Sequence, residues 1–173
     1  MSALLEDPEF LPDGGMLGFG LRHVYQVEGG EGLDHVYGLL KGSDATVHRA
    51  VRTLGFEPVL YLYFESELDD DNDFVEAGLI DRVIQSDGSP EVDNFISELP
   101  DHGGFVIRLE GADSEPEVVE VLHWVTPVTT FNRQSSAYVM YGNQAELGLA
   151  YGDVCLIVRI GKAGERLAYP TVA

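Results

Sequence analysis

The chain has 173 residues, long enough for one domain with its own core and too short to expect two. Thirty Asp and Glu face ten Lys and Arg, which gives a formal net charge of −20. A field of that sign repels nucleic-acid phosphates and anionic lipid surfaces. We therefore expect no direct nucleic-acid partner and no membrane, and no apolar run reaches the roughly 18 residues that a membrane span needs.

The cations are also unevenly distributed, because Lys41 and Lys162 are the only lysines beside eight arginines. High acidity with scarce lysine is typical of a protein adapted to molar salt. The Debye length there shrinks to about 3 Å, so self-repulsion is screened. A coding bias towards arginine and a functional acidic face are the two alternatives.

The N-terminal sequence MSALLEDPEFLPDGG contains no basic residue and no sustained apolar stretch. It is therefore not expected to be a signal peptide. The single cysteine, Cys155, cannot form an internal disulfide. These features favour a cytoplasmic or virion location.

Residues 1–20 are predicted to form an irregular arm, because prolines and glycines interrupt any regular pattern, and 21–173 to form a single α+β domain. The arm contains the apolar residues Met16, Leu17 and Phe19. They either fold back over the core of their own chain or dock on a neighbouring subunit. In the second case, these three residues are the candidate interface.

The first half of the domain is predicted to mix strands and helices from its apolar spacing and its turn residues. The expected strands cover 21–27 and 58–64, and the expected helices cover 33–40, 43–54, 74–84 and 89–99. Asp44 falls in the first turn of the second helix, where a carboxylate suits the helix dipole.

The second half is predicted to contain strands over 105–110, 118–125, 137–141 and 153–160, separated by polar or glycine-bearing turns. The fold class that follows is α+β. Helices of the N-terminal half would pack on one face of a mixed, mostly antiparallel sheet whose C-terminal half is a four-stranded meander.

An acidic run offers the candidate metal ligands, since Asp69, Asp71 and Asp73 alternate through DDDND. Dense carboxylate oxygens are the ligands that Ca²⁺ and Mg²⁺ prefer. The EF-hand pattern fails, however, because Phe74 stands where that loop needs glycine. We expect either a loosely bound Ca²⁺ or Mg²⁺ or a solvated loop, and no other cofactor.

No motif supplies a complete catalytic site. The run GGEG at 29–32 lies among carboxylates and lacks the lysine of a phosphate loop. The five histidines have no metal-ligand spacing, and Ser135 and Ser136 lack a nucleophile elbow. The sequence therefore predicts no catalytic residue and favours a protein that is not an enzyme.

The leading hypothesis is a non-enzymatic assembly or protein-interaction subunit, a virion or complex component adapted to high salt. Its partners would be protein subunits, either copies of itself or other chains. One alternative is an acidic inhibitor or immunity-type protein that imitates nucleic acid or caps a basic partner. Another is a small enzyme whose site forms only in three dimensions.

Overall fold

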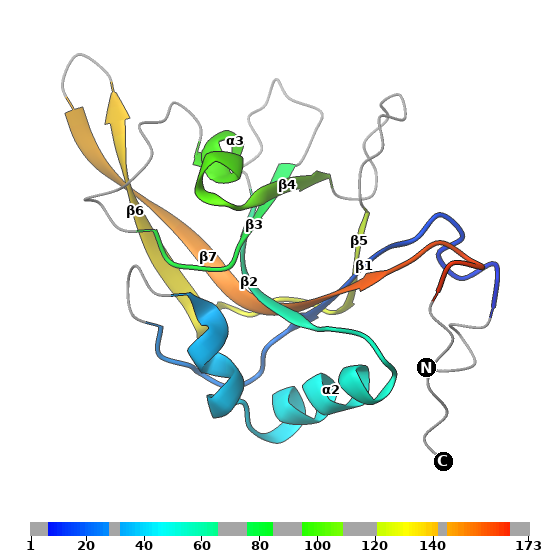
Figure 1. Ribbon diagram of the computed structural model, residues 1–173. Coiled ribbons are helices and arrows are strands. Elements are labelled where there is room, and N and C mark those ends of the chain that lie inside the picture. Colours follow the sequence, from blue (N-terminus) through cyan, green and yellow to red (C-terminus); the bar gives the residue numbers. More distant parts are fainter. Residues whose placement is uncertain are drawn as a thin grey trace.

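The computed structural model describes residues 7–27, 32–65, 76–84, 95–108, 121–141 and 145–166. In these ranges seven strands form one curled sheet in the order β4-β3-β2-β7-β1-β5, with β6 pairing with β7 outside this path (Figure 1). The strands are β1 (Gly15–Gly20), β2 (Val59–Glu65), β3 (Glu76–Ile80), β4 (Phe105–Arg108), β5 (Leu122–Thr126), β6 (Arg133–Tyr141) and β7 (Ala145–Ile160). The helices are α2 (Gly42–Thr53) and α3 (Phe95–Glu98), with 3-10 helices η1 (Leu33–Leu39), η3 (Leu99–His102) and η4 (Thr130–Asn132).

Strand β7 is the centre of the sheet. Its run from Val154 to Val158 is buried throughout, as expected for a strand covered on both faces. It pairs antiparallel with β2 on one edge and with β1 on the other. The N-terminal strand β1 is thus an interior strand, with β5 parallel to it on its far side.

The predicted irregular arm therefore contains a core strand. Met16, Leu17 and Phe19 are 0%, 5% and 7% exposed. The glycines between them allow a close approach rather than a break, because a Cβ on Gly18 would lie 2.5 Å from the ring of Trp124. The glycine-rich composition predicted irregular structure, and the tight packing of β1 against β5 explains the difference.

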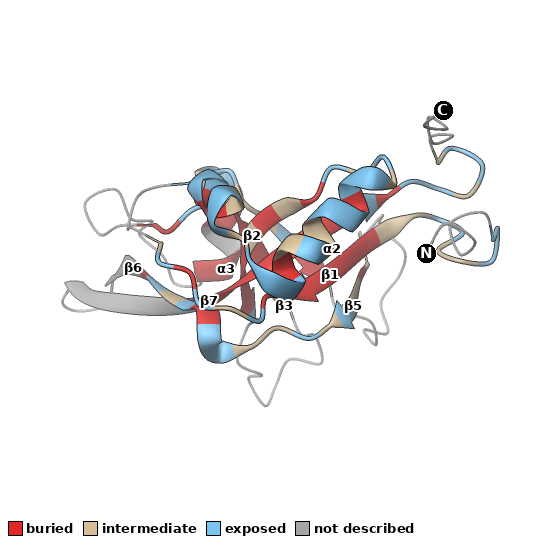
Figure 2. Cartoon of the chain, turned by 90° about the horizontal axis from the view of Figure 1, so that it is seen from below, coloured by how far each residue is buried: buried red, intermediate tan, exposed pale blue. Residues whose placement is uncertain are grey.

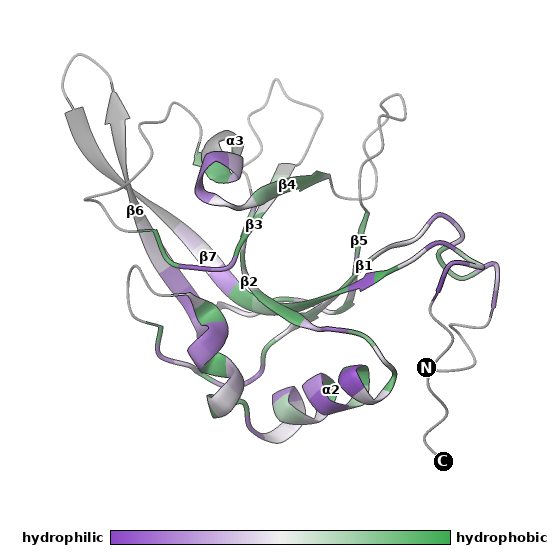
Figure 3. Cartoon of the chain, in the orientation of Figure 1, coloured by the Kyte–Doolittle hydropathy of each residue, from purple (hydrophilic) through white to green (hydrophobic). Residues whose placement is uncertain are grey.

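Residues alternate between the two faces of the sheet, as strand β2 illustrates. Leu60 and Leu62 pack in the same cluster as Val36 of η1 and Val51 of α2. On the opposite, concave face, the ring of Tyr63 contacts the ring of Trp124 edge-on at 5.0 Å between centroids. Buried residues occupy β1, β2 and the C-terminal half of β7, and exposed residues cover the outer side of α2 (Figure 2). Strands β2 and β4 are among the hydrophobic parts of the chain (Figure 3).

The predicted fold class is wrong. The sheet is a curled, mixed half-barrel and the dominant structure of the chain, rather than a layer covered by helices and completed by a meander. Within the predicted meander only β6 and β7 are paired neighbours, because β4 pairs with β3 and β5 pairs with β1. Strand pairing over long sequence distances therefore replaced the expected local pairing.

Individual elements agree better with the sequence. The helix expected over 43–54 is confirmed as α2, and the strand expected over 58–64 as β2. The helix expected over 74–84 is wrong, since β3 is a strand held between β2 and β4. The strand expected over 21–27 is also misplaced, because β1 ends at Gly20. None of the described helices is long and apolar enough to cross a membrane.

Candidate functional site: the ribbon of β6 and β7

Strand β7 is 16 residues long and pairs with two different strands along one edge. Its last residues, from Cys155, pair with β1, whereas residues 145–153 pair with β6. On the opposite edge the pairing with β2 stops at Asp153. Within the described part of the chain, residues 134–141 and 145–152 therefore pair only with each other. We call these two segments the ribbon, which extends away from the rest of the sheet in Figure 1.

The ribbon is almost free of charge in a chain of net charge −20. Glu146 is the only charged residue between positions 134 and 152. The backbone register places Val139 opposite Leu147 and Ala137 opposite Leu149. A segment with a single charge thus lies where the rest of the sheet does not pair with it.

Exposed strand edges are usually protected against pairing with other chains by lysines, prolines, charges or bulges. The stretch 134–141 contains no charged residue and no proline. Its pairing with β7 continues without a register shift. A solitary two-stranded ribbon is also only marginally stable in water. Residues 134–141 therefore lack the charges, prolines and bulges that usually prevent a further strand from pairing.

The end of the ribbon that joins the sheet, which we call its root, is fixed by an ion pair. The guanidinium of Arg133 donates two hydrogen bonds, each of 3.2 Å, to the carboxylate oxygens of Asp153, the residue opposite it in the register. The hydrogen bonds to Asp153 raise the pKa of Arg133 above its ordinary value. The side chain of Asp153 is only 11% exposed, so this pair is better shielded from water than most surface pairs.

Two buried polar groups extend this anchor on either side. Asn132, fully buried, accepts a 2.8 Å hydrogen bond from the backbone N–H of Tyr25 and donates its amide N–H to the carbonyl of His23. Ser136, also buried, accepts a 3.2 Å hydrogen bond from the backbone N–H of Ile84. The body of the protein therefore holds residues 132–136, which include the first three residues of the ribbon.

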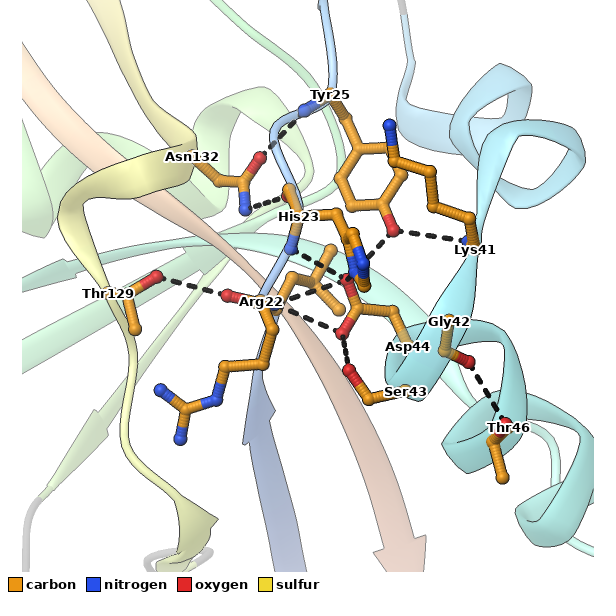
Figure 4. Close-up of polar contacts among 11 residues, drawn as sticks. Arg22, His23, Tyr25, Lys41, Gly42, Ser43, Asp44, Thr46, Thr129 and Asn132 are labelled. Atoms are coloured by element: carbon orange, nitrogen blue, oxygen red, sulfur yellow. Dashed lines mark hydrogen bonds and ion pairs between the residues drawn. The ribbon is translucent and has the colours of Figure 1, made fainter.

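Asn132 bonds the backbone of residues 23–25. The same segment is also fixed by the buried carboxylate of Asp44, at the start of α2 (Figure 4). This carboxylate accepts backbone hydrogen bonds of 3.0 Å from Arg22 and from His23. It also accepts a 2.8 Å bond from the hydroxyl of Tyr25 and a 3.0 Å contact from Nδ1 of His23. A carboxylate satisfied in this way ties two distant segments together.

The electrostatics agree with an ionised Asp44. Burial alone would raise the pKa of its carboxyl, but the hydrogen bonds from Tyr25, Arg22 and His23 outweigh burial and lower the pKa below its ordinary value. Burial and the hydrogen bond to Asp44 raise the pKa of Tyr25 to about 12. An ionised Asp44 can only accept, so Nδ1 of His23 carries the proton.

A histidine oriented by a buried carboxylate also occurs in catalytic sites. Here the ring lies against the start of α2, since a Cβ on Gly42 would lie 2.8 Å from Nε2 of His23. Gly42 has a φ of 55°, a conformation that favours glycine. We therefore assign His23 and Asp44 a positioning role towards the root of the ribbon.

The residues predicted from the sequence lie elsewhere. Met16, Leu17 and Phe19 are buried within their own chain, as in the first of the two alternatives. Their role as an interface stays a prediction. Asp69, Asp71 and Asp73 lie outside the described residues. Among the residues that are described, no group of three or more His, Cys, Asp or Glu side chains could hold a metal ion.

Sequence reasoning missed the anchor residues. Asp44 was expected to interact with its own helix dipole, whereas its carboxylate bonds residues 22–25. Asn132 lies in the stretch FNRQS, which predicted only a polar turn. The one signal for the ribbon was the gap in charge between positions 134 and 152.

Comparison of the chain with protein-family models, with curated proteins and with solved structures gave no match.

Proposed function

We propose that this chain is a non-enzymatic assembly subunit that binds another protein through the ribbon of β6 and β7. The observation that supports the proposal is the ribbon, which carries a single charged residue and whose two strands, within the described residues, pair only with each other beyond the sheet. Its root is held by Asn132, Arg133 and Ser136.

The mode of binding follows from the edge of β6 that faces away from β7, which no described strand pairs with. A partner strand that pairs with the edge of β6 gains a row of main-chain hydrogen bonds, and its side chains fill the alternate positions on each face. The low charge of the ribbon matters here, because a protein of net charge −20 repels other acidic proteins over most of its surface. The ribbon is where such repulsion is weakest.

A photo-crosslinking experiment tests this proposal. The photoreactive residue p-benzoylphenylalanine would replace Tyr151 in the ribbon and, as a matched control, Val125 on β5. These two side chains are 56% and 55% exposed. The tagged chain would be irradiated in its native cells at their own salt concentration, and covalent adducts would be identified by mass spectrometry.

We expect protein adducts from position 151 at several times the yield found at position 125. Each adduct would be a single defined protein, either a second copy or another chain. Absence of adducts at position 151, or equal yields at the two positions, would contradict an assembly role for the ribbon.

A further inference from the structure

We propose that the partner is a second copy of this chain, and that two copies pair edge to edge through antiparallel β6 strands. This inference rests on the proposed function and specifies the partner of the same ribbon. It names β6 as the contacting strand and a two-fold axis as the symmetry of the contact.

Charge restricts the surfaces through which two copies can meet. Two copies together carry twice the net charge of −20, so any contact between them must use a surface with few carboxylates. The stretch 134–141 has none, and Glu146 is the only charged residue of the ribbon. In molar salt, where the Debye length is about 3 Å, the remaining repulsion between the two bodies is screened.

Symmetry also favours the pairing of two identical strands. An antiparallel ladder is unchanged by a two-fold rotation, so two identical strands make the same hydrogen bonds in both directions. A parallel ladder lacks this symmetry. Closed two-fold dimers are also the commonest soluble assemblies, because one self-complementary surface serves both copies. The edge of β6 can therefore be satisfied by another β6 without any further partner.

The position of the two-fold axis follows from the part of β6 that lies beyond its anchor. The hydroxyl of Ser136 accepts a hydrogen bond from the backbone N–H of Ile84 and so holds this part of β6 to the body of the protein. The part of β6 beyond that anchor runs from Ala137 to Tyr141. Pairing this stretch with itself puts Val139 opposite Val139 of the other copy, and Ala137 opposite Tyr141. Five paired residues match the length of an ordinary strand of about 5–6 residues.

Single-cysteine variants test this register through the disulfides that form between two copies. The variants are Val139→Cys, Ala137→Cys and Tyr141→Cys, each in the full chain at molar KCl with a mild oxidant. Directly opposite residues of an antiparallel pair have Cβ atoms about 4.5–5.5 Å apart, close enough for a disulfide to form with small adjustments. The native Cys155 is fully buried, so the unmodified chain serves as the baseline. Val125→Cys on β5, at a side chain 55% exposed, controls for random collisions.

We expect Val139→Cys to form a disulfide-linked dimer by itself. Ala137→Cys and Tyr141→Cys should cross-link at least tenfold faster when mixed than when either is alone. Equal cross-linking of all three variants with themselves would indicate parallel pairing and overturn the proposal. Any other pattern, including none above the Val125→Cys control, would overturn it as well.

Light scattering provides an independent measurement. The unmodified chain should have the molar mass of two chains in molar KCl. Val139→Lys should have the mass of one, because it puts two like charges face to face at the axis. Val24→Lys, at an exposed valine outside the ribbon, should remain dimeric. A monomeric unmodified chain that still gives photo-adducts with a different protein at position 151 would overturn self-pairing and leave the assembly role standing, whereas no adducts at all would overturn both.

Discussion

The hydroxyl of Tyr25 donates a 2.8 Å hydrogen bond to the carboxylate of Asp44, and both side chains are buried. The backbone N–H of the same tyrosine is bonded to Asn132, the residue immediately before β6. A continuous path of polar contacts therefore runs from the start of α2 to the root of the ribbon. Asp44 lies 19 residues from Tyr25 in the sequence, and Asn132 lies 107 residues from it, so only the folded chain brings the three together.

Replacing Asp44 with Asn should destabilise the fold by about 3 kcal/mol, because several donors lose a charged acceptor inside the protein. The depressed pKa of Asp44 also predicts a pH dependence. Its contribution is fully present above the unfolded pKa of about 3.8 and is lost as the pH falls below that value. Urea unfolding between pH 2.5 and pH 7 should show this loss in the unmodified chain and not in Asp44→Asn. The exposed Asp101, replaced in the same way, should leave the acid limb unchanged.

Tyr25→Phe should alter the stability of the fold at the opposite, alkaline end of the pH range. The pKa of Tyr25 is raised from 10.0 to about 12, so its contribution to stability is fully present below pH 10 and is lost as the pH rises through 12. Thermal unfolding of the unmodified chain should therefore fall over this interval, and Tyr25→Phe should lower the melting temperature at pH 7 while flattening the alkaline decline. An alkaline limb of the same steepness in both proteins would contradict this assignment.

Asn132→Ala should loosen the root of the ribbon. The substitution leaves the N–H of Tyr25 and the carbonyl of His23 without their partner, at a cost of about 2 kcal/mol for buried groups. Hydrogen exchange should accelerate in residues 133–136 more than in β2. Gln134→Ala, which removes only a 3.5 Å contact to the carbonyl of Asn132, is the matched control and should change exchange little.

Stability should rise with salt. The net charge of −20 repels itself, and screening at molar KCl reduces that repulsion. The melting temperature measured from low salt to multimolar KCl should increase throughout. A flat or falling curve would show that the acidity has another cause.

The thiol of Cys155 should be inert in the native chain. It is fully buried in β7, and burial raises its pKa far above its ordinary value, so little thiolate forms at neutral pH. A thiol reagent should label it only after denaturation, whereas a cysteine placed at Val24, which is 65% exposed, should react at once. Rapid native labelling of Cys155 itself would show that β7 opens.

Several elements could be predicted because their cause is local. Val47 and Val51 recur at helical spacing with Gly55 as the stop, and α2 ends where that pattern ends. The run VLYLYF is apolar on both faces, and β2 is buried on both. Phe74–Ile84 lacked such a pattern, and there the neighbours β2 and β4 decided in favour of a strand.

The sequence by itself determined the charge of the protein, the types of its most periodic elements and the stretch from 134 to 152, in which Glu146 is the only charged residue. Only the tertiary structure decided that β1 lies beside β7 and that β7 extends beyond the end of its pairing with β2. It also decided that Asp44 bonds the segment that contacts Asn132. Periodicity within a segment reports which face is buried, since burial depends on the side chains of that segment. The choice of a pairing partner depends on competition among strands far apart in the chain, and no local pattern records its outcome.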